Sequence, residues 1–109
     1  MRKLMFVFTL STIALLAQGG GAPKNLKVLK PEEVRASMGM AVAGLGVKCT
    51  DCHVADRSSD ELPAKLVARR MFAMTAEINA KFPDGKAHVT CYTCHRGQKE
   101  PLTAAPAAQ

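Results

Sequence analysis

The chain has 109 residues and a formal net charge of +6, from 15 basic and 9 acidic side chains. A chain of this length forms one compact domain at most. The positive charge does not indicate nucleic-acid binding, because no run of Lys and Arg is longer than two residues. Aromatic side chains that could stack on bases are limited to 4 Phe and 1 Tyr.

Residues 1–19 are typical of a secretory signal peptide that is cleaved. Arg2 and Lys3 give a positive start, residues 4–16 are almost entirely apolar, and small residues follow. The apolar run is shorter than the roughly 20 residues that span a bilayer, which disfavours a retained anchor. We therefore expect a periplasmic or otherwise extracytoplasmic protein, in which residues 20–30 form an exposed lead-in.

Residues 31–101 are predicted to form one all-α domain with little or no sheet, because no alternating apolar pattern occurs. A first helix is expected over 31–44, since Pro31 suits the first helical position. The apolar residues that follow share one helical face: Val34, Met38, Val42 and Leu45. Gly44 and Gly46 should end this helix.

A second helix is expected over 63–82, with Ser58, Ser59 or Asp60 available to cap its start. Its apolar residues repeat at helical spacing and predict a single buried stripe: Val67, Met71, Met74, Ile78 and Phe82. Pro83 and Gly85 should stop it. Residues 102–109 contain only Leu, Thr, Ala, Pro and Gln and predict a flexible tail.

The four cysteines all fall in two copies of a C-x-x-C-H motif, Cys49 to His53 and Cys91 to His95. This pattern is typical of covalent haem attachment. Two thiols at this spacing, Cys49 with Cys52 and Cys91 with Cys94, can form thioethers with the two vinyl groups of one porphyrin. The adjacent His53 or His95 then becomes the proximal iron ligand. The sequence therefore predicts two haem c groups.

Three other uses of these cysteines explain less of the pattern. Disulfides are common in exported chains, but they do not require a histidine after each pair. A zinc site with four thiolates is chemically reasonable, but it also leaves both histidines unexplained. A thioredoxin-like redox pair belongs with alternating strands and helices, which this sequence lacks.

The sixth iron ligand has to come from elsewhere in the chain. Met38 lies on the apolar face of the first predicted helix, eleven residues before Cys49. Met71 and Met74 are three residues apart on the second helix, so they share a face and their spacing does not choose between them. His88 is a reserve ligand. Methionines on helices are more often ordinary packing residues, but here we favour ligation for two of them.

Several longer stretches resemble the tetrahaem cytochrome subunit of photosynthetic reaction centres. They are L-G-V-K-C-T-D-C-H (45–53), A-R-R-M (68–71) with I-N (78–79), and V-T-C-Y-T-C-H-R-G (89–97). The similarity covers roughly residues 31–101 and corresponds to one two-haem half of that subunit. In that family a methionine on the helix before each motif supplies the sixth ligand, which implies Met38 and Met71. A family histidine that ligates a haem of the other half lies farther from its motif than His88 does.

These features predict an electron carrier rather than an enzyme, with redox proteins or membrane electron-transfer complexes as partners and no small-molecule substrate. The two haems should form most of the core, because so short a chain buries little by itself. The alternatives are a subunit of a multihaem electron-conducting assembly, which includes a homo-oligomer, and a small haem peroxidase.

Overall fold

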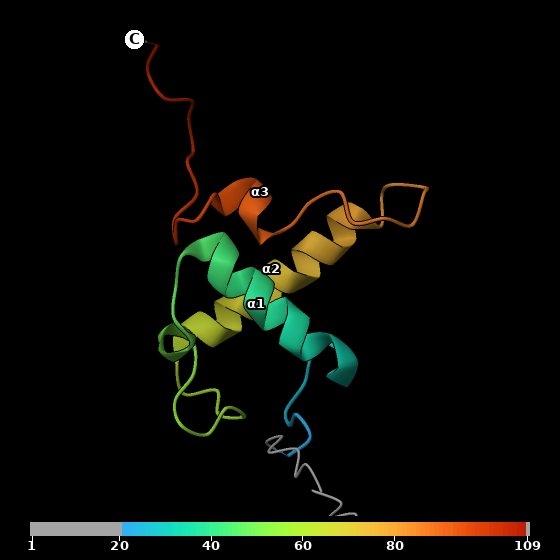
Figure 1. The fold of residues 1–109 in the computed structure, drawn as a ribbon, viewed down its shortest axis with the longest axis vertical. Coiled ribbons are helices and arrows are strands. Elements are labelled where there is room, and N and C mark those ends of the chain that lie inside the picture. Colours follow the sequence, from blue (N-terminus) through green and yellow to red (C-terminus); the bar gives the residue numbers. More distant parts are fainter. Residues whose placement is uncertain (1–20, 109) are drawn as a thin grey trace, which may run out of the picture.

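The computed structural model describes residues 21–108, and the predicted signal peptide lies outside these residues. All regular structure in the described part of the chain is helical, as predicted. The helices are η1 (Pro31–Glu33), α1 (Val34–Leu45), η2 (Cys49–Asp51), α2 (Pro63–Asn79) and α3 (Cys91–His95). In Figure 1, α1 crosses in front of α2, and α3 lies beyond the carboxyl end of α1. None of the helices within 21–108 is long and apolar enough to cross a bilayer.

The first predicted helix is confirmed as a short 3-10 turn that continues into α1. Pro31 opens the turn, and the Lys30 backbone N–H donates to the Glu33 carboxylate at 3.0 Å. At the other end Gly46 adopts φ 64°, and its N–H donates to the Val42 carbonyl at 3.0 Å. Gly46 therefore acts as a left-handed cap that turns the chain toward the first motif.

The second predicted helix is also present, but α2 ends at Asn79, three residues before the expected boundary. The N–H groups of Lys81 and Phe82 donate to Ile78 and Asn79 carbonyls, so the chain tightens into turns ahead of Pro83. The expected side-chain cap is absent at its start, where Leu62 precedes the first turn. Asp60 instead pairs with Lys65 and Arg69, at 3.2 and 3.0 Å.

The closest helix packing joins the end of α1 to α3. Gly44 is buried against the backbone of Cys91 and Tyr92, and its carbonyl accepts a hydrogen bond from the Gly97 N–H at 2.8 Å. A side chain at Gly44 would block this contact. The first half of the chain therefore supports the second motif directly.

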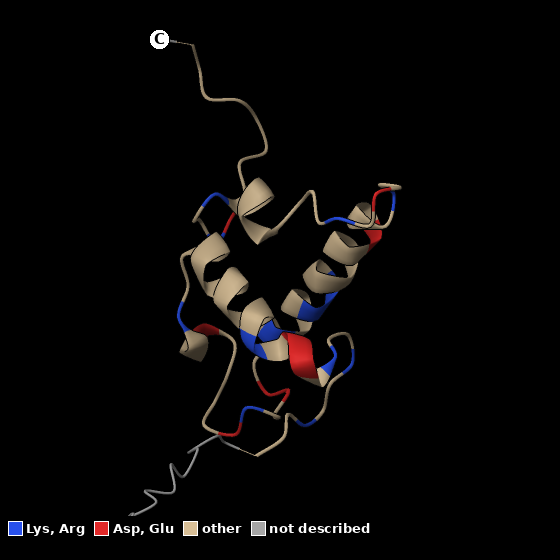
Figure 2. Ribbon diagram, turned by 45° about the vertical axis from the view of Figure 1, so that its right-hand side comes forward, with Lys and Arg blue, Asp and Glu red and all other residues tan. Residues whose placement is uncertain are grey.

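The predicted buried stripe on α2 is not buried against protein. Its members are between 39% and 46% exposed, and no hydrophobic side chain within 21–108 is buried. Two of its members, Met71 and Met74, line an open cavity rather than packing against another helix. Figure 2 shows that α3 and most of α1 carry no Lys, Arg, Asp or Glu, whereas charges gather in the loops and on α2.

Candidate functional site

The two motifs are built by the same local device. In the first, the Asp51 carboxylate accepts the Lys48 backbone N–H at 2.7 Å. In the second, the Thr93 hydroxyl accepts the Thr90 N–H at 2.9 Å. Each of these side chains lies two residues after the first cysteine of its motif. It accepts the backbone N–H of the residue that precedes that cysteine. The third motif position is thereby explained as a helix-capping position that starts the short helix in which the first cysteine of each motif lies.

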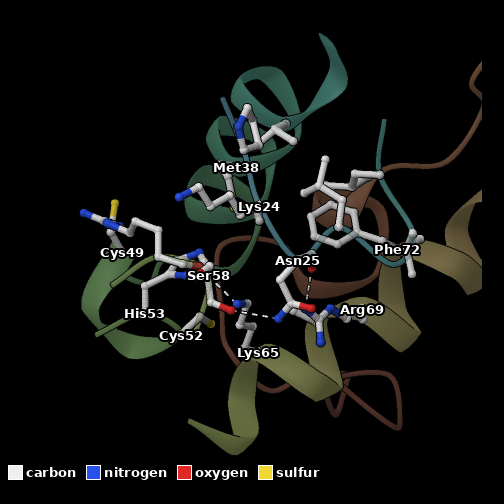
Figure 3. Close-up of a pocket in the computed structure, with 18 of the residues that line it drawn as sticks. Lys24, Asn25, Met38, Cys49, Cys52, His53, Ser58, Lys65, Arg69 and Phe72 are labelled. Atoms are coloured by element: carbon white, nitrogen blue, oxygen red, sulfur yellow. Dashed lines mark hydrogen bonds between the residues drawn. The ribbon is translucent and has the colours of Figure 1, made fainter. Parts of the chain in front are cut away.

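The first motif opens onto a cavity of about 690 Å³. Its lining includes Cys49, Cys52 and His53 from the motif and Met38 from α1. Figure 3 shows Met38 on one helix and His53 on another segment of the same cavity. The structure therefore brings the predicted proximal and sixth ligands of the first haem to one space.

The second motif opens onto a separate cavity of about 620 Å³. Cys94 and His95 line it, together with both Met71 and Met74 from α2. Cys91 is not among its lining residues, because it packs against Gly44. Both Met71 and Met74 line this cavity, so its geometry does not choose between them as the sixth ligand, and neither does their helical spacing.

Helix α2 contributes to the walls of both cavities. Ala68 and Phe72 line the first, whereas Met71 and Met74 line the second. Neighbouring positions on one helix point in different directions, about 100° apart per residue. The two cavities are therefore held next to each other by a single helix.

The two cavities differ in charge. The first is lined by six basic side chains and one acidic side chain, Asp56. The basic residues are Lys24, Lys27, Lys48, Arg57, Lys65 and Arg69. The second cavity is lined by one charged residue, Arg96. The first cavity is therefore the better site for an anionic group.

The motif histidines also differ in their surroundings. The Nδ1 atom of His95 lies 3.1 Å from the Gln98 carbonyl oxygen. Because a carbonyl only accepts, Nδ1 carries the hydrogen in this contact and Nε2 is left to act as a ligand. The Nδ1 atom of His53 is buried without a hydrogen-bond partner. Burial, followed by the charges of Lys65 and Arg57, lowers the pKa of His53, which favours the neutral imidazole that metals bind.

The four thiols are free in the structure. Burial raises the pKa of Cys91, and burial together with the charge of Asp51 raises the pKa of Cys52. Within residues 21–108 there is no group of three or more His, Cys, Asp or Glu side chains that could hold a metal ion. The cysteines thus form two separated pairs rather than a four-thiolate cluster.

His88 lines neither cavity. Its ring stacks on Phe82 with centroids 4.1 Å apart, and its Nε2 atom lies 2.8 Å from the Asp84 carboxylate. The Asn79 side chain fixes the same segment, because its Oδ1 accepts the N–H groups of His88 and Val89 at 2.8 and 2.9 Å. Asn79 therefore ties the chain just before the second motif to the end of α2.

A haem fits this arrangement. Each cavity has a volume within the range of about 300–1,000 Å³ that is usual for small-molecule and cofactor pockets. Each is lined by at least one motif cysteine, the motif histidine and a methionine from another helix. The helices also leave apolar side chains uncovered around these spaces, as expected where a cofactor completes the core.

Two segments that were predicted to lie outside the helical domain contribute to the cavities. Residues 21–29 line the first, and Leu102, Ala104, Ala105 and Pro106 line the second together with Pro101, the last residue of the predicted domain. Both segments lack regular structure. Short-range patterns therefore gave no signal for these contacts, although Leu26, Val28, Leu29 and Leu102 are apolar residues in otherwise polar or small-residue stretches.

The chain matches the family model described as "Photosynthetic reaction centre cytochrome C subunit" over residues 22–105. It is 46% identical over 62 residues to the photosynthetic reaction center cytochrome c subunit of Thermochromatium tepidum, covering 51% of this chain and 15% of the relative. The corresponding subunit of Rubrivivax gelatinosus is 41% identical over 64 residues, covering 53% and 18%. Cytochrome c-554 of Chloroflexus aurantiacus is 40% identical over 57 residues, covering 47% and 14%. No solved structure matches the chain. Each aligned stretch is thus a small part of a much longer relative.

Proposed function

The chain belongs to the photosynthetic reaction centre cytochrome c subunit family, whose members are haem-based electron carriers, and on that premise we propose that it is an exported dihaem carrier of single electrons. The observation that carries the proposal is that each C-x-x-C-H histidine shares a cavity with a methionine from a preceding helix. A haem iron held at each site would supply a ferric/ferrous couple.

In this assignment the chain holds each group by three kinds of contact. The thiols of Cys49 and Cys52, and of Cys91 and Cys94, form the thioether links, and His53 and His95 are the proximal ligands. Met38 is the sixth ligand of the first site. Met71 is the sixth ligand of the second, by its match to the family position, and Met74 is the reserve. A thioether sulfur favours the reduced iron and raises its potential.

The positive charge of the first cavity would help to orient the first haem. The two propionates of a haem are anionic, and the first cavity offers basic side chains from three different segments, including Lys24, Lys48 and Arg57. At the second site Arg96 is available. The Gln98 carbonyl holds the His95 ring through Nδ1, which fixes the tautomer that presents Nε2 to the iron.

The proposed location is extracytoplasmic, because covalent attachment retains a cofactor outside the cell membrane and residues 1–19 have the pattern of an export signal. The proposed partners are redox proteins or membrane electron-transfer complexes. An electron carrier is favoured over a peroxidase because His88, the histidine outside the motifs, lines neither cavity and is paired with Asp84.

The test is the mass of the purified protein after expression with a c-type maturation system. We expect the processed polypeptide plus two haems, and a c-type absorption band on reduction. A Cys91→Ser/Cys94→Ser variant should carry one haem, and so should the matched Cys49→Ser/Cys52→Ser variant. A bare polypeptide mass from a strain that matures another c-type cytochrome would refute the proposal.

A further inference from the structure

The segment Gly21–Leu29 contributes nine residues to the lining of the first cavity. It has no helix or strand of its own, so no ladder of backbone hydrogen bonds holds it in place. Its position has to come from side-chain contacts. One residue, Asn25, makes the hydrogen bonds that join this segment to the rest of the described chain.

Asn25 connects the segment to two other parts of the molecule. Its Nδ2 atom donates to the Ser58 carbonyl at 2.7 Å and to the Asp60 carboxylate at 3.0 Å. The backbone carbonyl of Asn25 accepts a hydrogen bond from Arg69 Nη2 at 2.9 Å. Figure 3 shows Asn25 beside Ser58 and Arg69 at the cavity. These bonds cross 33 to 44 residues of sequence, so they link distant segments.

Asparagine is well suited to position 25, both in its backbone conformation and in its hydrogen bonds. Asn25 adopts φ 58°, in the left-handed region where asparagine is much more common than other side chains. Its amide supplies a donor for two acceptors at once. Asp60, one of these acceptors, is itself held by Lys65 and Arg69, and both of these residues line the cavity. The anchor of the segment is therefore part of the cavity wall.

We propose that Asn25 is a positioning residue that fastens Gly21–Leu29 over the first haem, making this segment part of the haem site. The inference rests on the proposed function. The segment lies where Lys24 and Lys27 add positive charge to the cavity and where its apolar side chains exclude water. Less solvent and more positive charge both raise the potential of a haem.

The experiment compares holoprotein carrying Asn25→Gly with wild type and with Asn79→Ala. Glycine accepts φ 58° without strain, so Asn25→Gly removes the amide and keeps the backbone conformation available. Asn79→Ala is the matched control, because it removes a similar side-chain clamp at the second motif. Two readouts are used: the rate of tryptic cleavage after Lys24 and Lys27, and the two midpoint potentials.

We expect Asn25→Gly to raise cleavage at these two lysines about five- to thirtyfold, as the loss of two modest hydrogen bonds predicts. It should lower one midpoint potential and leave the other unchanged. Asn79→Ala should leave cleavage at Lys24 and Lys27 at the wild-type rate and shift the other potential. Two-haem protein in which Asn25→Gly matches wild type in cleavage, or shifts both potentials equally, would overturn the inference alone. Protein without covalent haem would overturn the proposed function as well.

Discussion

Replacing Gly44 by alanine tests the contact between α1 and α3. A Cβ atom at this position would lie 2.6 Å from Cys91 Cβ and 2.8 Å from the Tyr92 backbone nitrogen. Neither atom is the end of a flexible side chain, so the clash cannot be relieved by a rotamer change. The two helices would have to separate, and the second motif would lose its support from the first half of the chain.

The expected cost follows from three terms. Overpacking of this kind costs typically about 1–3 kcal/mol. Loss of the Gly97 to Gly44 hydrogen bond costs about 1 kcal/mol, and the better helix propensity of alanine returns about 1 kcal/mol. The last two terms cancel, so Gly44→Ala should lower the free energy of unfolding by about 1–3 kcal/mol.

The measurement is denaturant unfolding of the holoprotein, with Gly39→Ala as the matched control. Gly39 lies in the same helix and is exposed, and no atom outside its immediate neighbours and the helix backbone lies within 4 Å of the place that an added methyl group would take. Alanine there should stabilise the protein by about 0.5–1 kcal/mol through helix propensity. If Gly44→Ala were as stable as Gly39→Ala, the close approach of α1 and α3 would not exist in solution.

Two further predictions concern the second site and acid stability. Met71→Leu should abolish the ferric spectrum of a methionine-ligated haem at one site and lower its potential, whereas Met74→Leu should retain both; the opposite result would assign the ligand to Met74. The bond from Arg69, then that from Asn25, holds the pKa of Asp60 well below its ordinary value. Because the folded pKa is the lower one, the Asp60 carboxylate stabilises the fold at neutral pH, and this contribution is lost as the pH falls below about 4. Asp60→Asn should therefore be less stable at pH 7 and lose less stability in acid, as measured by denaturant unfolding across pH; an unchanged acid profile would contradict this account.

The positions of α1 and α2 could be predicted from the sequence because they follow local patterns, and the C-x-x-C-H motifs are local patterns too. Pro31 opens the 3-10 turn that leads into α1, Gly46 ends α1, and the apolar repeat locates α2. The repeat did not reveal what α2 faces. A stripe that includes Met71 looks the same whether a helix or a cavity covers it, since periodicity reports only that the residues share a side.

Long-range contacts could not be predicted from the same patterns. Asn25 reads as a loop residue, and its hydrogen bonds to Ser58 and Arg69 depend on how three distant segments meet. The contact of Gly44 with Cys91 is similar, because a glycine near a helix end is equally well explained as a stop signal. Such residues gain their roles from tertiary structure.

Helix α2 lines both cavities, and this has a consequence for how each proposed haem site can be altered on its own. Met71 and Phe72 are adjacent in sequence, yet they address different cavities. If a haem occupies each cavity, as proposed, a substitution at Met71 acts on the second haem and one at Phe72 acts on the first. A change that tilts the whole helix cannot be confined in this way, because it moves the walls of both cavities together. In the proposed dihaem carrier, point changes on α2 should therefore alter the difference between the two potentials, and a shift of the whole helix should move both.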